Sequence, residues 1–138
     1  MACNLLKGKK GIIFGALNEK SIVWQIAEKA YEQGAEIILT NAPVALRMGQ
    51  IKELAEELNT KVIPADATKI EDIEKLFQES MDHFGGKVDF ILHSIGMSPN
   101  VRKGYTYDDL NYENFHKTLD ISALSFHKIL QTARKMDA

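Results

Sequence analysis

The stretch Gly11-Ile12-Ile13-Phe14-Gly15-Ala16-Leu17-Asn18-Glu19-Lys20-Ser21-Ile22 joins an apolar strand to an apolar-faced helix through a loop of small residues. Backbone N–H groups at the N-terminus of such a helix can hold the pyrophosphate of a dinucleotide. No bulky side chain can then stand between the loop and the phosphates, a condition that Gly15 and Ser21 meet. The spacing is not G-x-G-x-x-G, so taken alone the loop fits an ordinary strand-to-helix turn equally well.

The composition describes one ordinary globular domain spanning residues 1–138. The chain has 138 residues, of which 45% are hydrophobic and 26% charged, and a formal net charge of -2. Such a balance offers no excess of basic residues to neutralise a nucleic-acid backbone. Apolar runs stay far below the roughly 20 residues of a membrane-spanning helix, and the N-terminus lacks a secretory apolar region. We therefore expect a cytoplasmic protein that binds neither nucleic acid nor a membrane.

The only cysteine and the four histidines indicate no metal centre. Cys3 stands alone and cannot form an internal disulfide. The histidines have no metal-like spacing to one another or to this cysteine, so structural or solvated roles are favoured. We expect no metal site in this chain.

Short β-branched segments alternate with segments of helical periodicity. Strands are predicted at 9–14, 36–40, 61–64 and 88–93, and helices at 21–34, 46–58, 70–84 and from 112 onward. This alternation predicts parallel strands joined by right-handed crossovers. The fold class is thus α/β, a doubly wound Rossmann-type parallel sheet with helices on both faces.

Ligands of such sheets bind beyond the carboxyl ends of the strands, which draws attention to the loops there. The second strand is followed by Thr40, Asn41 and Ala42, with no acid to bind an adenosine ribose. Arg47 could meet a 2′-phosphate, although a solvated arginine at a helix entry is the more common case. Asp66 could accept hydrogen bonds from an adenine amino group, or could equally be a turn or capping aspartate.

The loop after the fourth strand, Ser94-Ile95-Gly96, is made of small residues that would let a nicotinamide ribose approach the backbone. His93 ends the strand that leads into it. Further along, three tyrosines lie near acidic residues in an irregular segment, without the basic residues that typify nucleic-acid stacking. We expect Tyr105, Tyr107 and Tyr112 to pack that segment.

Together these segments resemble one family. Phe14 to Ile22, Asp66-Ala67, His93-Ser94-Ile95-Gly96 and Asp120-Ile121-Ser122 occur in the order and spacing of bacterial enoyl-[acyl-carrier-protein] reductases, a branch of the short-chain dehydrogenases/reductases. The resemblance covers residues 5–136. In this branch the first loop is longer than T-G-x-x-x-G-x-G, and serine replaces the second glycine, as Ser21 does here.

The resemblance implies a role for each matching position. It assigns the pyrophosphate and adjoining ribose to Gly15, Ala16, Ser21 and Ile22, the adenine to Asp66 and Ala67, and the nicotinamide half to Ser94, Ile95 and Gly96, with Ile121 nearby. It places the acyl substrate beside Gly96, Met97 and Ser98. The implied reaction is hydride transfer from NADH, with NADPH possible, to the trans-2 double bond of an enoyl thioester on acyl carrier protein.

The resemblance also implies a tyrosine and a lysine, seven positions apart, that stabilise the enolate oxygen. No tyrosine of this chain has a lysine at that spacing, so we expect both residues beyond Ala138 and assign no catalytic residue here. The chain is thus expected to be the N-terminal half of a reductase, inactive alone and incomplete at the C-terminal side of its sheet. The implied full-length assembly is a homotetramer, for which the apolar helix from Tyr112 onward, with Leu119, Phe126 and Leu130 on several sides, offers partial support.

Two other classes of function remain open on the sequence. One is another short-chain dehydrogenase that acts on a carbonyl, which would carry Tyr-x-x-x-Lys in its later part. The other is a non-catalytic dinucleotide-binding protein, which the sequence would suit if the gene ended at Ala138.

Overall fold

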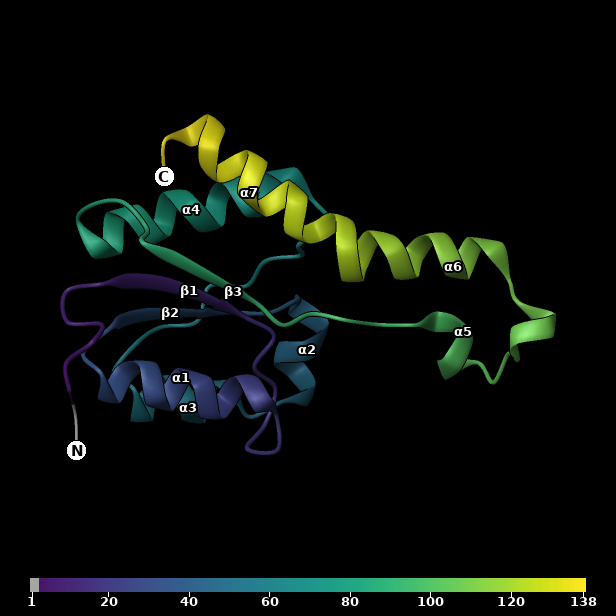
Figure 1. Ribbon diagram of the computed structural model, residues 1–138, viewed down its shortest axis with the longest axis horizontal. Coiled ribbons are helices and arrows are strands. Elements are labelled where there is room, and N and C mark those ends of the chain that lie inside the picture. The colour runs from purple at the N-terminus through teal and green to yellow at the C-terminus, as the bar shows by residue number, and fades with distance from the viewer. Residues whose placement is uncertain (1–2) are drawn as a thin grey trace.

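A computed structural model describes residues 3–138 as a three-layered α/β fold built on a parallel sheet (Figure 1). The strands are β1 (Lys10–Phe14), β2 (Glu36–Thr40) and β3 (Phe90–His93), in the order β2-β1-β3. Phe14 lies opposite Thr40 on one side and His93 on the other. The three carboxyl ends, and the loops that follow them, therefore meet at one edge of the sheet.

Helices cover both faces of this sheet, as predicted for a doubly wound fold (Figure 1). Alternate strand residues point to opposite faces, so Ile13 and Leu39 pack with α1 (Ile22–Glu32) and α3 (Ile51–Glu57). Ile12, Phe14 and Ile38 pack instead with α4 (Ile70–Phe84) and α7 (Ser125–Met136). After their first residues, β1 and β2 are buried on both faces, which explains their apolar runs, whereas the residues of β3 are half-buried.

The predicted third strand at 61–64 is wrong as a strand. The segment lies beside β2, with Leu39 N–H donating to the carbonyl of Lys61 and Ile63 N–H to that of Leu39, but only Val62 forms a bridge. Ala65 N–H still donates to the carbonyl of Asn41 at 3.1 Å, but β2 ends at Thr40 and no second bridge forms within residues 3–138. Pro64 alternates with the residues that face β2, so its missing N–H costs no bond to β2, and proline is tolerated at such an edge.

The helix predicted over 46–58 is two helices, α2 (Pro43–Met48) and α3. The break falls at Gly49, where an added β-carbon would lie 2.6 Å from the carbonyl oxygen of Leu17. That same carbonyl accepts the N–H of Gln50 at 2.7 Å. The loop after β1 therefore occupies the space and the hydrogen-bonding group that a continuous helix would need.

The apolar residues at the start of the first helix lie only partly on its buried face. Ile22 and Ile26 are exposed on α1, whereas Val23 and Trp24 are buried with Ala27 and Ala30. The buried face of α1 thus runs through Val23, Ala27 and Ala30 with Trp24 beside them, and the two isoleucines lie outside it.

Beyond β3 the chain leaves the sheet as an arm, drawn in green in Figure 1. It comprises α5 (Pro99–Arg102), the 3₁₀ turn η1 (Tyr107–Asp109) and α6 (Tyr112–Leu119), and returns to the domain through the π-helical segment η2 (Asp120–Leu124). The last predicted helix is thus present, but with a π-helical segment between its two α-helical parts.

The prediction that tyrosines pack this arm is wrong. Tyr107 is 96% exposed and Tyr112 74% exposed. Buried asparagines hold the arm instead: the side chain of Asn100 donates to the carbonyl of Asn111 at 3.1 Å and accepts the N–H of Asn111 at 3.1 Å. Asn114 also donates to Asn100, so amide groups satisfy the backbone where the arm crosses itself.

Within residues 3–138, β3 pairs with β1 alone, so its other edge is open. A cavity of about 190 Å³ runs along this edge and is lined by Val88, Ile91, Phe126 and Leu130, among others. Across the same described residues, no helix is both long and apolar enough to cross a membrane.

Candidate dinucleotide site

The loop after β1 is locked against the loop after β3. Gly15 has φ +100°, and a β-carbon added to it would lie 1.9 Å from the carbonyl oxygen of Ser94. Its N–H donates to Thr40 at 3.1 Å, while Ser94 N–H donates to Phe14 at 3.2 Å. Only glycine fits this position, because both the dihedral angle and the space exclude a side chain.

Ser21 braces the same loop from its other end. Its Oγ accepts the N–H of Asn18 at 3.1 Å and that of Leu17 at 3.3 Å. The N–H groups of Ile22 and Val23, in the first turn of α1, have no acceptor within the helix and carry its positive dipole end. Serine therefore shapes the loop, and the helix N-terminus next to it is what remains open to an anion.

Ala16 contributes only backbone to this site. Its side chain is fully buried in the core, and its carbonyl accepts the side-chain amide of Asn41 at 3.0 Å. Asn41 also accepts the N–H of Ala42, so it joins the loops that follow β1 and β2. No local pattern in the sequence marks this role of Asn41.

The aspartate after the third predicted strand forms a turn. Asp66 Oδ1 accepts the N–H and the hydroxyl of Thr68 at 3.0 and 2.7 Å. Partial burial acts to raise the pKa of Asp66, but the hydrogen bonds from Thr68 and the charges of Lys69 and Lys128 outweigh it, so the pKa is lowered. Of the two roles considered for Asp66, the structure contains the turn. The half-exposed carboxylate stays ionised and is able to accept further hydrogen bonds. Ala67 beside it is buried.

Lys128 links this turn to the helix that covers the site. Its ammonium donates to the carbonyl of Thr68 at 3.2 Å and to Asp120 at 2.6 Å. Asp120 and Lys128 are eight residues apart, a spacing that suits one helix face when a π-helical segment adds a residue. No signal in the sequence marks this lysine, because the π-helical segment is itself not predicted.

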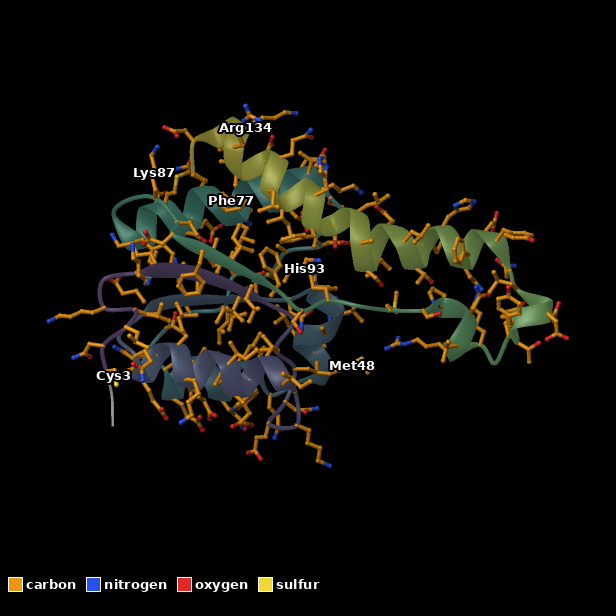
Figure 2. The ribbon with its side chains drawn as sticks, in the orientation of Figure 1. Cys3, Met48, Phe77, Lys87, His93 and Arg134 are labelled. Carbon is orange, nitrogen blue, oxygen red and sulfur yellow. The ribbon has the colours of Figure 1, made fainter. Side chains whose placement is uncertain are left out.

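The loop from Ser94 to Ser98 is held by η2 and the start of α7. Figure 2 shows His93 below this helix, and its Nε2 lies 2.8 Å from the hydroxyl of Ser125. Ser125 donates to the carbonyl of half-buried Ile121, so Nε2 carries the proton that is donated to Ser125. Farther along, Ser122 contacts Met97, and Ser98 caps α5.

The structure thus brings most of the predicted site residues to one edge of the sheet. The loops at 15–22, 66–68 and 94–98 surround the carboxyl ends of the strands, with Ile121 above the last of them. Arg47 is exposed in the last turn of α2 and forms no salt bridge within residues 3–138. The groups that this edge offers are backbone N–H groups, hydroxyls and one carboxylate, a set that suits a neutral-to-anionic polar ligand.

Comparison with known proteins agrees with this geometry. The family model described as enoyl-(acyl carrier protein) reductase matches residues 15–138. The chain belongs to this family. Among the reductases of the family, the enoyl-[acyl-carrier-protein] reductase [NADH] 1 of Rhizobium meliloti is 35% identical over 98% of this chain and 49% of its own length. The chain spans about half the length of the curated reductases it matches.

Solved structures of reductases share the fold. The FabI–NADH complex from Alistipes finegoldii superposes with a TM-score of 0.96 and 69% identity, over 98% of this chain and 48% of that one. The Bacillus cereus enoyl-acyl carrier protein reductase, solved with NADP⁺ and indole naphthyridinone, has a TM-score of 0.84 and 28% identity, over 95% and 51%.

Proposed function

We propose that this chain is the cofactor-binding half of an NADH-dependent enoyl-[acyl-carrier-protein] reductase of fatty acid biosynthesis. The observation that carries the proposal is the locked contact of Gly15 with Ser94, which sets the N-terminus of α1 and the Ser94–Ser98 loop side by side at the carboxyl edge. Membership of the reductase family and the 69% identity to a FabI–NADH complex support it.

The residues present suit NADH, which would supply the hydride when bound. The first-turn N–H groups of Ile22 and Val23 lack intrahelical acceptors and would hold the pyrophosphate, with Gly15 and Ala16 giving it a close approach through backbone alone. Ser21 would keep that loop in place. Asp66 and Ala67 would border the adenine, with the ionised Asp66 accepting from its amino group.

The nicotinamide half would lie against Ser94, Ile95 and Gly96, with Ile121 above it, and the acyl group of the thioester beside Gly96, Met97 and Ser98. The chemistry of the enolate oxygen belongs to the tyrosine and lysine that the family resemblance implies, which this chain does not contain at the required spacing. This chain therefore binds and orients the reactants, and the whole protein, as a homotetramer, completes the reaction.

NADH is proposed over NADPH. The segment from Asn41 to Leu46 contains no basic residue, and exposed Arg47 is a single charge in the last turn of α2. A 2′-phosphate is normally met by paired or multiple donors. Because the Bacillus cereus relative was solved with NADP⁺, the rates with NADH and with NADPH should both be measured.

The deciding experiment is a steady-state assay of the native protein at its full length with an enoyl thioester and either cofactor. We expect reduction with NADH to be at least about tenfold faster than with NADPH, a difference of about 1.4 kcal/mol. A protein that reduces a β-keto thioester and not the enoyl thioester would be a carbonyl-reducing dehydrogenase instead. NADH binding without any turnover would favour the non-catalytic class.

A further inference from the structure

The hydroxyl group of Ser122 forms hydrogen bonds with both backbone groups of Met97. Ser122 Oγ accepts the Met97 N–H at 3.1 Å and lies 3.3 Å from the Met97 carbonyl oxygen, to which it donates its own proton. Met97 lies in the loop beyond β3, which ends at His93, so no strand ladder reaches its backbone groups. Ser122 satisfies both of them instead.

The same helical segment holds the start of the loop. Ser125 follows Ser122 by three residues, a spacing that places both on one helix face, and its hydroxyl contacts His93. The loop is thus fixed at His93 and at Met97. Between these two points the structure, over residues 3–138, gives no hydrogen bond to the backbone groups of Ile95 and Gly96. The two ends of the loop are thus held, and the backbone groups of Ile95 and Gly96 are available to a ligand.

Gly96 lies closest to the clamp. A β-carbon built on it would be 3.9 Å from Ser122 Oγ, so the hydroxyl is adjacent to the open backbone without contacting it. Loss of this hydroxyl would free the Met97 peptide groups, since a buried or half-buried N–H without its acceptor seeks another partner. The nearest available partner for those groups would be water or the bound ligand.

We propose that Ser122 is a positioning residue, which clamps Met97 so that the backbone of Ile95 and Gly96 alone faces the nicotinamide and the acyl group. The inference rests on the proposed function for its ligands. It predicts that Ser122 acts on the nicotinamide and thioester end of the site and leaves the adenine and pyrophosphate end unchanged.

The first arm of the test is structural and needs no activity. In Ser122→Ala, the amide hydrogen of Met97 should exchange with solvent at least about tenfold faster, because its only acceptor is removed. The amide of Arg102, which donates to Ser98, serves as the internal reference and should not change. Ala123→Ser, an exposed change on the same segment, is the matched control and should leave both rates as they are.

The second arm measures the native full-length protein. Ser122→Ala should lower kcat/KM for the enoyl thioester about tenfold, while the affinity for ADP-ribose, which lacks the nicotinamide, changes less than about twofold. Ser122→Thr, which keeps the hydroxyl, should recover most of the loss. Unchanged exchange at Met97, or unchanged kcat/KM in an active protein, would overturn the proposal. An inactive parent protein would overturn the proposed function, and Met97 exchange would still decide whether Ser122 clamps the loop.

Discussion

Gly15 and Ser94 are in backbone contact across the carboxyl edge of the sheet, so close that a β-carbon on Gly15 would lie 1.9 Å from the Ser94 carbonyl oxygen. This contact joins two loops that are far apart in the sequence. It makes the glycine a structural requirement of the fold before any ligand is considered, and it makes the position a sensitive test of the site.

Gly15→Ala is expected to destabilise the protein and to abolish NADH binding. A positive φ costs a non-glycine residue about 1–2 kcal/mol, and the clash with Ser94 adds to it because backbone must move. Gly104→Ala is the control, since Gly104 also has positive φ but nothing within 4 Å of its added β-carbon. Urea unfolding and NADH fluorescence titration measure the two effects, and equal losses in both variants would refute the role of the contact.

Ser21→Ala is expected to weaken NADH binding by about 1 kcal/mol, or roughly fivefold, because two loop N–H groups lose their acceptor. Ser21→Thr keeps the oxygen and should bind as the parent does. The measurement is isothermal titration with NADH. An alanine variant with the affinity of the parent would mean that the loop keeps its shape without the hydroxyl.

The stability of the protein is expected to fall as the pH drops below about 6.5, with His93 as one cause. Burial lowers the pKa of His93, against a smaller opposing effect of a hydrogen bond that the ring donates to its own backbone. Between the ordinary value and the lowered one, the unfolded chain takes up a proton that the folded chain does not, so the free energy of unfolding decreases as the pH falls. Above the ordinary value both states are neutral and the effect is absent.

Urea midpoints of the parent and of His93→Gln between pH 7.5 and pH 5 check this assignment. The glutamine variant should lose less stability across that range than the parent does. His127→Gln, at an exposed position of α7, should follow the parent. The assignment fails if the two variants have the same pH dependence.

The 138-residue chain by itself is expected to associate through the open edge of β3. Unpaired strand groups flanked by an apolar cavity recruit another chain, and Leu130, 45% exposed, lines that cavity. Leu130→Glu should shift the chain toward the monomer in light scattering, because a carboxylate would be buried in the contact. Ile26→Glu, on the other side of the sheet, is the control. A monomeric parent chain would contradict the prediction.

In the full-length protein, Leu130→Glu tests whether α7 forms the subunit interface of the proposed homotetramer. If Leu130→Glu leaves a folded tetramer unchanged in size-exclusion and light scattering, α7 is not the subunit interface. Coverage of Leu130 by later residues of the same subunit would then account for its apolar character.

The sequence predicts the placement of the loops at this edge where a single residue has a strong local preference. The small residues at Gly15 and Gly96, and the alternation that brings their loops to one edge, follow from local pattern. Helix boundaries at glycines, such as the end of α4 at Gly85, follow for the same reason. The strand predicted at 61–64 is reduced to one bridge because its partner β2 ends at Thr40, which a count of β-branched residues in the segment itself does not register.

The remaining features depend on contacts between distant segments. The break between α2 and α3 is set by Leu17, and the brace at Ala16 by Asn41. The π-helical segment carries Ser122 to Met97 and Asp120 to Lys128. No local sequence pattern predicts any of these pairings, because each depends on which loops the sheet brings together. The residues that hold the site in place are therefore the ones that sequence reasoning missed.

The asparagine cluster of the arm holds residues 100–111 together as a separate structural unit. Its two ends are joined to each other by Asn100 and Asn111 rather than to the sheet, so its length can vary without shifting the register of either flank. The stretch between those ends is the natural place to insert a tag or exchange sequence between relatives. Tyr107, almost fully exposed at its tip, would report such changes without disturbing the nucleotide end of the molecule.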